Sequence, residues 1–153
     1  VGALYARDVL FVRANEPEHG YAFLSEPLRL DVVAVAAPVK PRTAKLADGS
    51  VGYASADEEA AMLCAIRAAL QVCAANGARD VVLSALGCGA FHNPPEATAR
   101  LFARALDEYC GYFRRVVFAV YDDHNARGEG NFAPFQRVLN GYRATPPAAA
   151  GTA

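Results

Sequence analysis

The sequence lacks a strong net charge, a long apolar run and any pair of cysteines at C-x-x-C spacing. Its 153 residues carry a formal net charge of -1, which argues against a protein that holds nucleic acid by bulk electrostatics. No apolar run is long enough to span a bilayer and no signal peptide is present, so we expect no membrane partner. The low net charge is compatible with a small anionic ligand, because local amides and one or two arginines suffice to hold it.

The cysteine spacing indicates free thiols. Cys64 and Cys73 fall in one predicted helix, too far apart along it to bridge each other, and Cys88 and Cys110 lie elsewhere. We therefore expect an intracellular, reducing compartment, with cytoplasm, nucleus and organelle all open. Cys64, Cys73 and Cys110 are predicted to be small core residues.

Composition and length predict one compact domain. Hydrophobic residues make up 54% of the chain and charged residues 20%, which is ordinary for a globular protein. Residues 1–143 form the predicted domain, and residues 144–153, rich in alanine, proline and threonine, are expected to be a disordered tail. The chain begins at Val1 rather than methionine, which fits a fragment, a processed product or the ordered part of a longer protein.

Three helices are predicted from capping and periodicity. Ser55 caps the first, Glu58 completes an S-x-x-E capping box, and Gly77 ends it. Leu63, Ile66, Leu70 and Cys73 form its buried stripe. The second helix runs over residues 94–109, and the last, short helix begins at a capping Asn131 and closes near Gly141.

Four apolar runs of strand length alternate with these helices or precede them, at residues 7–13, 30–37, 80–86 and 115–121. The runs at 30–37 and 80–86 are near-continuous, which indicates strands covered on both faces. Alternation from Leu30 onward predicts parallel strands joined by right-handed crossovers. Ligands bind outside the carboxyl ends of such strands. Three loops are expected to meet there, at residues 38–43, 87–95 and 122–131.

Residues 81–95, VVLSALGCGAFHNPP, are the most informative segment. An apolar run ends in a glycine-rich turn that opens into a helix start marked by Asn93 and Pro94. Glycines let the backbone approach a ligand, and the free amides of a first helical turn carry partial positive charge. The segment therefore predicts a phosphate pocket; the alternative is a tight strand-to-helix connection with nothing bound.

Side chains near this turn allow competing interpretations. Phe91 either contacts a sugar or plugs the space under the loop. Cys88 lies at a helix N-terminus, where a thiol has a lowered pKa, with His92 or His124 as a conceivable base. A small residue between two glycines usually serves the backbone path, so we do not assign catalysis to it. The same three residues have the right types for a metal site but no recognised spacing.

These segments resemble a known family. GCGAFHNPP after an apolar strand, followed by EATARLFARAL and RVVFAVYDDHN, is similar to the bacterial-type poly(ADP-ribose) glycohydrolases, which are macrodomain hydrolases. ALYARDVLFVR and EPLRLDVVAVAAPVKPRT fit the same pattern, so the resemblance extends to about Gly141. It implies a macrodomain-like, three-layer α/β/α fold with a mostly parallel sheet, N-terminally incomplete and matching the C-terminal portion of the family domain.

The resemblance also implies ligand contacts. Main-chain amides that wrap the diphosphate of ADP-ribose would come from Gly87, Cys88, Gly89 and Ala90. Phe91 would pack against the ribose next to the scissile bond. The adenine side would be bordered by Asp122, Asp123, Asn125 and Phe132, although the aspartates and Asn125 also suit a solvated turn. No cofactor and no metal is implied.

One family feature is missing. The catalytic motif of the family, a triple glycine followed by a glutamine and two glutamates, does not occur in the sequence. Glu58 and Glu59 are adjacent but follow no glycine loop, so no catalytic residue is assigned in this chain. The predicted function is ADP-ribose binding, with hydrolysis of the ribose–ribose bond if the motif is supplied. Partners would be ADP-ribose, poly(ADP-ribose) ends or an ADP-ribosylated protein. The alternative is a non-catalytic relic that acts as a reader or as a structural subunit of a larger assembly.

Overall fold

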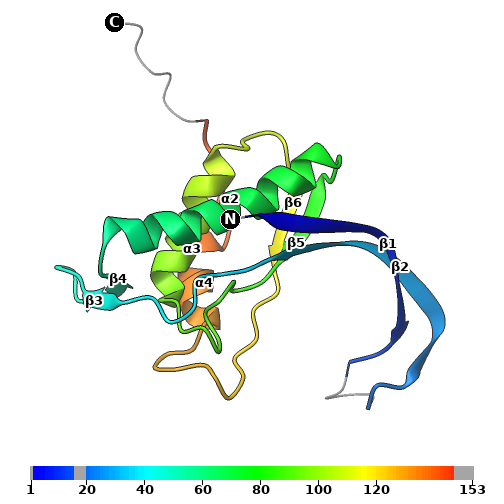
Figure 1. Cartoon of the computed structure of the whole chain (residues 1–153), viewed down its shortest axis with the longest axis horizontal. Coiled ribbons are helices and arrows are strands. Elements are labelled where there is room, and N and C mark those ends of the chain that lie inside the picture. Colours follow the sequence, from blue (N-terminus) through cyan, green and yellow to red (C-terminus); the bar gives the residue numbers. More distant parts are fainter. Residues whose placement is uncertain (1, 16–19, 147–153) are drawn as a thin grey trace, which may run out of the picture.

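A computed structural model describes residues 2–15 and 20–146 of the chain (Figure 1). The strands are β1 (Ala3–Arg13), β2 (Phe23–Val35), β3 (Thr43–Lys45), β4 (Val51–Tyr53), β5 (Asp80–Leu83) and β6 (Arg115–Phe118). The helices are α2 (Ala56–Ala75), α3 (Pro95–Asp107) and α4 (Phe132–Leu139). None of these helices is both long enough and apolar enough to cross a bilayer.

The sheets are smaller than predicted. β1 pairs with β2 and β3 with β4, both antiparallel, and only β5 and β6 are parallel among the described strands. A mixed α/β fold is present, but three layers around a mostly parallel sheet are not confirmed. The connection from β1 to β2 spans only residues 14–22, and a connection that short joins antiparallel neighbours.

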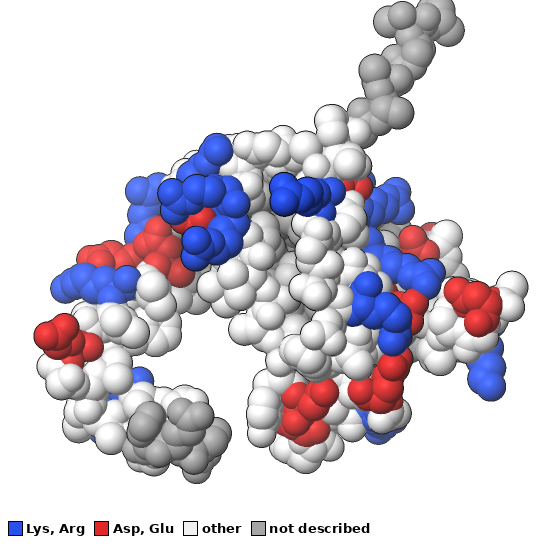
Figure 2. Space-filling model, turned by 180° about the vertical axis from the view of Figure 1, so that it is seen from behind, with Lys and Arg blue, Asp and Glu red and all other residues white. Residues whose placement is uncertain are grey.

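The β1–β2 pair contacts α2 at one end, and its outer half extends away from the helices (Figure 1). Figure 2, seen from behind, shows an open gap between its curved outer half and the rest of the molecule. Leu28 and Leu30 are 55% and 53% exposed, and Val82 in β5 is 70% exposed. The prediction that residues 30–37 and 80–86 are covered on both faces is therefore wrong for these strands. Apolar composition shows that a strand is able to be buried, but it does not determine whether other segments pack on it.

The core lies between the helices and β6. Ser55 caps α2 as predicted, since its hydroxyl accepts a hydrogen bond from the Glu58 amide at 3.4 Å. All four residues of the predicted stripe are buried. Phe102 of α3 packs with its ring centroid 5.0 Å from that of Phe118 in β6 and 6.2 Å from that of Phe135 in α4. The predicted helix and strand patterns thus build one contiguous core.

The cysteines divide into two buried and two exposed thiols. All four are free. Cys73 and Cys88 are buried, whereas Cys64 and Cys110 are exposed, so the prediction that Cys64 and Cys110 are core residues is wrong. Cys64 lies on the outer face of α2 beside the stripe, and Cys110 follows the end of α3.

The end of the described chain lies against the core. Ala144 packs on the core cluster, and the Thr145 amide donates to the Asp107 carboxylate at 2.8 Å. The predicted tail at residues 144–153 falls mostly outside the described residues, and the domain boundary at 143 stays a prediction.

Candidate functional site

The three loops predicted to meet at one edge do meet. A cavity of about 320 Å³ is bordered by all three. Its lining residues are Lys40, Pro41, Thr43, Val51, Cys88, His92, Asn93, Pro95, Arg127 and Asn131. The Lys40 amide donates to the Phe91 carbonyl at 2.8 Å, and a guanidinium nitrogen of Arg127 lies 3.3 Å from Nε2 of His92. Each of the other two loops therefore contacts the glycine loop directly.

The glycine loop folds on itself through short-range hydrogen bonds. The Cys88 amide donates to Ala85, the His92 amide to Gly89 and the Asn93 amide to Gly87, at 2.9–3.0 Å. These three amides are therefore not available to a ligand. Of the four residues whose amides the resemblance implies as diphosphate contacts, Cys88 therefore contributes no free N–H.

The remaining amides of the loop are unpaired. Within the described part of the chain, the amides of Gly87, Gly89, Ala90 and Phe91 donate to no protein acceptor. Gly89, Ala90 and Phe91 are consecutive, and successive free amides form the concave sites that bind anions. The Phe91 side chain is 40% exposed, so it does not act as a plug under the loop.

Asn93 ties the glycine loop to its neighbours, a role that sequence reasoning missed. Its side chain is buried, and Nδ2 donates to the Pro38 carbonyl at 2.8 Å and to the Gly87 carbonyl at 3.0 Å. Its Oδ1 accepts from the Tyr53 hydroxyl at 3.3 Å. An asparagine before two prolines signals a turn, and nothing local in the sequence identifies its distant partners.

The Cys88 thiol is poorly suited to act as a nucleophile. It is buried, and its sulfur contacts the Leu86 carbonyl at 3.6 Å. Burial raises the pKa of Cys88 to about 11, so the thiol is protonated at neutral pH. Among the described residues no group of three or more His, Cys, Asp and Glu side chains is arranged to hold a metal ion.

The loop at residues 122–131 also stabilises the start of α4. The Asp122 carboxylate accepts from the Asn131 amide at 2.6 Å and from the Phe132 amide at 3.1 Å. Asn131 is the N-cap residue of α4, as predicted, but its side chain makes no cap bond, and the Asp122 carboxylate accepts the amide hydrogen bonds instead. Asp123 accepts from the backbone and side-chain nitrogens of Asn125, both at 2.9 Å. Those bonds order the turn and lower the pKa of Asp123. Phe132 is 48% exposed.

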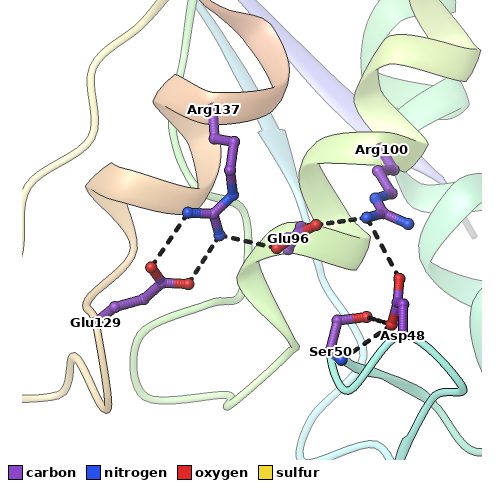
Figure 3. A network of polar contacts seen from close by, with 6 residues as sticks. All are labelled: Asp48, Ser50, Glu96, Arg100, Glu129 and Arg137. Carbon is purple, nitrogen blue, oxygen red and sulfur yellow. Dashed lines mark hydrogen bonds and ion pairs between the residues drawn. The ribbon is translucent and has the colours of Figure 1, made fainter.

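A network of ion pairs anchors this loop to the helices (Figure 3). Arg137 of α4 contacts Glu129 and Glu96, both at 2.8 Å. Glu96 also pairs with Arg100 at 2.5 Å. The hydrogen bonds from Arg137 hold the pKa of Glu96 and that of Glu129 below the ordinary value of 4.5. The network fixes the end of the 122–131 loop to the first turn of α3.

Replacing Arg137 by glutamine should lower the melting temperature by a few degrees at pH 7. Because the two carboxyl pKa values are depressed in the folded state, their stabilisation is present above about pH 4.5. It is lost as the pH falls through the lowered folded values. Thermal unfolding followed by circular dichroism should show a smaller difference in melting temperature between the variant and the wild type at pH 3 than at pH 7. Arg143→Gln, at a site with no ion pair to a described acid, is the control. A difference in melting temperature that does not change with pH would contradict the stabilising role of these ion pairs.

No family model and no curated sequence matches the chain. A poly(ADP-ribose) glycohydrolase from Deinococcus radiodurans, solved in complex with ADP-ribose, is 26% identical at a TM-score of 0.70. That match covers 91% of this chain and 52% of the other.

A second match is the poly(ADP-ribose) glycohydrolase from Thermomonospora curvata, bound to the inhibitor ADP-HPD. It is 27% identical at a TM-score of 0.69, over 88% of this chain and 48% of the other. The chain thus spans about half the length of these enzymes. The resemblance predicted from the glycine loop and its flanking segments is confirmed, and over about 90% of its length the chain is similar in structure to the bacterial poly(ADP-ribose) glycohydrolases.

Proposed function

We propose that the chain is an ADP-ribose-binding domain of the poly(ADP-ribose) glycohydrolase type. The observation that carries the proposal is the row of free amides at Gly89, Ala90 and Phe91. Free amides in a row suit a diphosphate, since each can donate to a phosphate oxygen without a change in the protein. The similarity to an enzyme solved with ADP-ribose supports the same ligand.

The other predicted contacts take their places around this diphosphate. Gly87 forms the turn and offers one more free amide, while Cys88 serves as a small residue beneath the loop. The exposed ring of Phe91 packs against the ribose, and the exposed ring of Phe132 borders the adenine. Asp123 and Asn125 lie on the same side as Phe132 in this proposal, and Asp122 supports them by capping α4.

Hydrolysis requires one more group. The leaving ribose oxygen needs a carboxyl group held protonated near it, while water attacks the anomeric carbon. Glu58 and Glu96 do not meet this need. A backbone amide and side chain of Arg42 lower the pKa of Glu58, and Arg137 lowers that of Glu96. We therefore assign the acid to a carboxyl group other than Glu58 and Glu96, and without such a group the chain acts as a reader of ADP-ribose.

Calorimetry with ADP-ribose tests the proposal through Gly89. A Cβ at Gly89 would meet only Asn125 Cβ, at 3.9 Å, so substitution there should not disturb the fold. Gly89→Asp places a carboxylate among the free amides, and we expect at least a tenfold loss of affinity because it repels the diphosphate. Gly89→Ala adds the carbon without the charge and should stay within about threefold of wild type.

The outcomes separate two claims. A wild-type chain that does not bind ADP-ribose would refute the proposed function. Wild-type affinity in Gly89→Asp would leave ADP-ribose binding standing and refute the loop assignment. Release of ADP-ribose from the polymer by the 153-residue chain alone would contradict its role as a reader.

A further inference from the structure

The cavity between the three loops carries uncompensated positive charge. Lys40 and Arg127 line it together with His92, and among the described residues that line it none is acidic. Neither Lys40 nor Arg127 forms an ion pair with a described carboxylate. Nearby arginines differ, because each is paired with an acid: Arg42 with Glu58, Arg100 with Glu96 and Asp48, Arg137 with Glu96 and Glu129. The cations of the cavity therefore lack the partner that their neighbours have.

Backbone strain coincides with these cations. Lys40 has a φ of 48° and His92 a φ of 55°, in the left-handed region that costs an L-residue about 1 kcal/mol or more. Two backbone hydrogen bonds hold these conformations in place: the Lys40 amide donates to the Phe91 carbonyl, and the His92 amide donates to the Gly89 carbonyl. Strain of this kind persists where the surrounding structure over-determines it, and it clusters at ligand sites.

The cavity and the free amides are separate places on one loop. Cys88, His92 and Asn93 line the cavity, whereas Gly89, Ala90 and Phe91 do not. One ADP-ribose has a single diphosphate, and the proposed function assigns it to the free amides. A phosphate group that binds in the cavity would therefore come from a second ADP-ribose unit. At most about 14 Å of chain separates Gly89 from Asn93, so one continuous ligand can reach both.

We propose that this cavity binds a second phosphate group, supplied by the neighbouring unit of a poly(ADP-ribose) chain. The proposal rests on the proposed function and deepens it. Lys40 and Arg127 contact the second phosphate, and His92 orients the Arg127 guanidinium at 3.3 Å. A lysine and an arginine are the side chains that match phosphate oxygens. The two cations would then favour a polymer end over free ADP-ribose.

Calorimetry on the full chain with ADP-ribose and with a two-unit ADP-ribose oligomer tests this. Lys40→Gln and Arg127→Gln should each weaken oligomer binding about tenfold, the usual effect of losing one charge-assisted hydrogen bond. Monomer affinity should change less than about twofold. Lys45→Gln and Arg143→Gln remove an exposed charge that does not line the cavity, and they should change neither affinity.

Salt dependence gives a second measurement. Oligomer affinity in the wild type should fall more steeply with salt than monomer affinity, and the two slopes should become equal in the double variant. Equal losses for monomer and oligomer in the single variants would overturn the proposal, because the cavity would then hold the monomer. Unchanged oligomer affinity would also overturn it.

A titration with inorganic phosphate tests whether the anion in the cavity is a free phosphate rather than a phosphate group of the polymer. If phosphate binds the wild type in a Lys40-dependent way and the oligomer binds no tighter than the monomer, a free phosphate occupies the cavity and the polymer assignment is wrong. Failure of the proposed function looks different, since the wild-type chain would then not bind the ADP-ribose monomer at all.

Discussion

Gly87→Ala should lower the free energy of unfolding by about 3 kcal/mol, through two separate effects. The backbone φ of Gly87 is 70°, where a side chain costs about 1–2 kcal/mol. A Cβ there would also lie 2.6 Å from Ala37 Cβ and 2.6 Å from Asn93 Nδ2. Neither neighbour is the free end of a flexible chain, so the loop must shift, and such overpacking costs about 1–3 kcal/mol. Urea denaturation followed by circular dichroism measures the loss.

Alanine substitutions at two other glycines separate the cost of backbone strain from the cost of steric crowding. Gly77 has a φ of 82° with nothing within 4 Å of an added Cβ, so Gly77→Ala carries the strain alone. Gly89→Ala carries neither effect. We expect the losses to rank Gly87 first, Gly77 second and Gly89 last. Equal losses at Gly87 and Gly77 would show that the close approach to Ala37 and Asn93 is not a real constraint.

Asn93→Leu should cost about 3 kcal/mol, although it keeps the branched shape and the number of side-chain heavy atoms. Asn93 is 1% exposed, and its side chain pairs with Pro38, Gly87 and Tyr53. Leucine leaves the part-buried Pro38 carbonyl without its side-chain donor and removes one partner of the buried Tyr53 hydroxyl. A polar group left unsatisfied in the interior costs about 1–3 kcal/mol. Urea denaturation at 25 °C gives the value directly.

Ligand binding should respond as well, because Asn93 joins the loop at residues 38–43 to the glycine loop. Under conditions where Asn93→Leu stays folded, we expect ADP-ribose affinity to fall several-fold as the free amides lose their fixed orientation. Asn140→Ala, at an exposed C-cap residue of α4, is the control and should stay within about 0.5 kcal/mol of wild type. A loss for Asn93→Leu no larger than that of the control would mean that the buried bonds do not hold the site together.

Local signals predicted the helices and the glycine loop well. The capping bond from Glu58 to Ser55 closes within three residues, and the buried stripe of α2 follows from helical periodicity alone. The free amides of the glycine loop also depend on its own short turns. The meeting of three loops at one edge was predicted correctly from the order of the elements, and the cavity lies there.

Contacts between distant segments settled the rest. Asn93 reaches Pro38 across 55 positions, and no pattern around Asn93 identifies that partner. Lys40 and Arg127 look like ordinary loop cations until the fold brings them to one cavity without an acid. The apolar run at residues 30–37 has the composition of a covered strand, yet it pairs with β1 and leaves Leu30 exposed. Hydrogen bonds within one turn depend on neighbouring residues and can be predicted from them, whereas burial and charge pairing depend on which remote segments pack together.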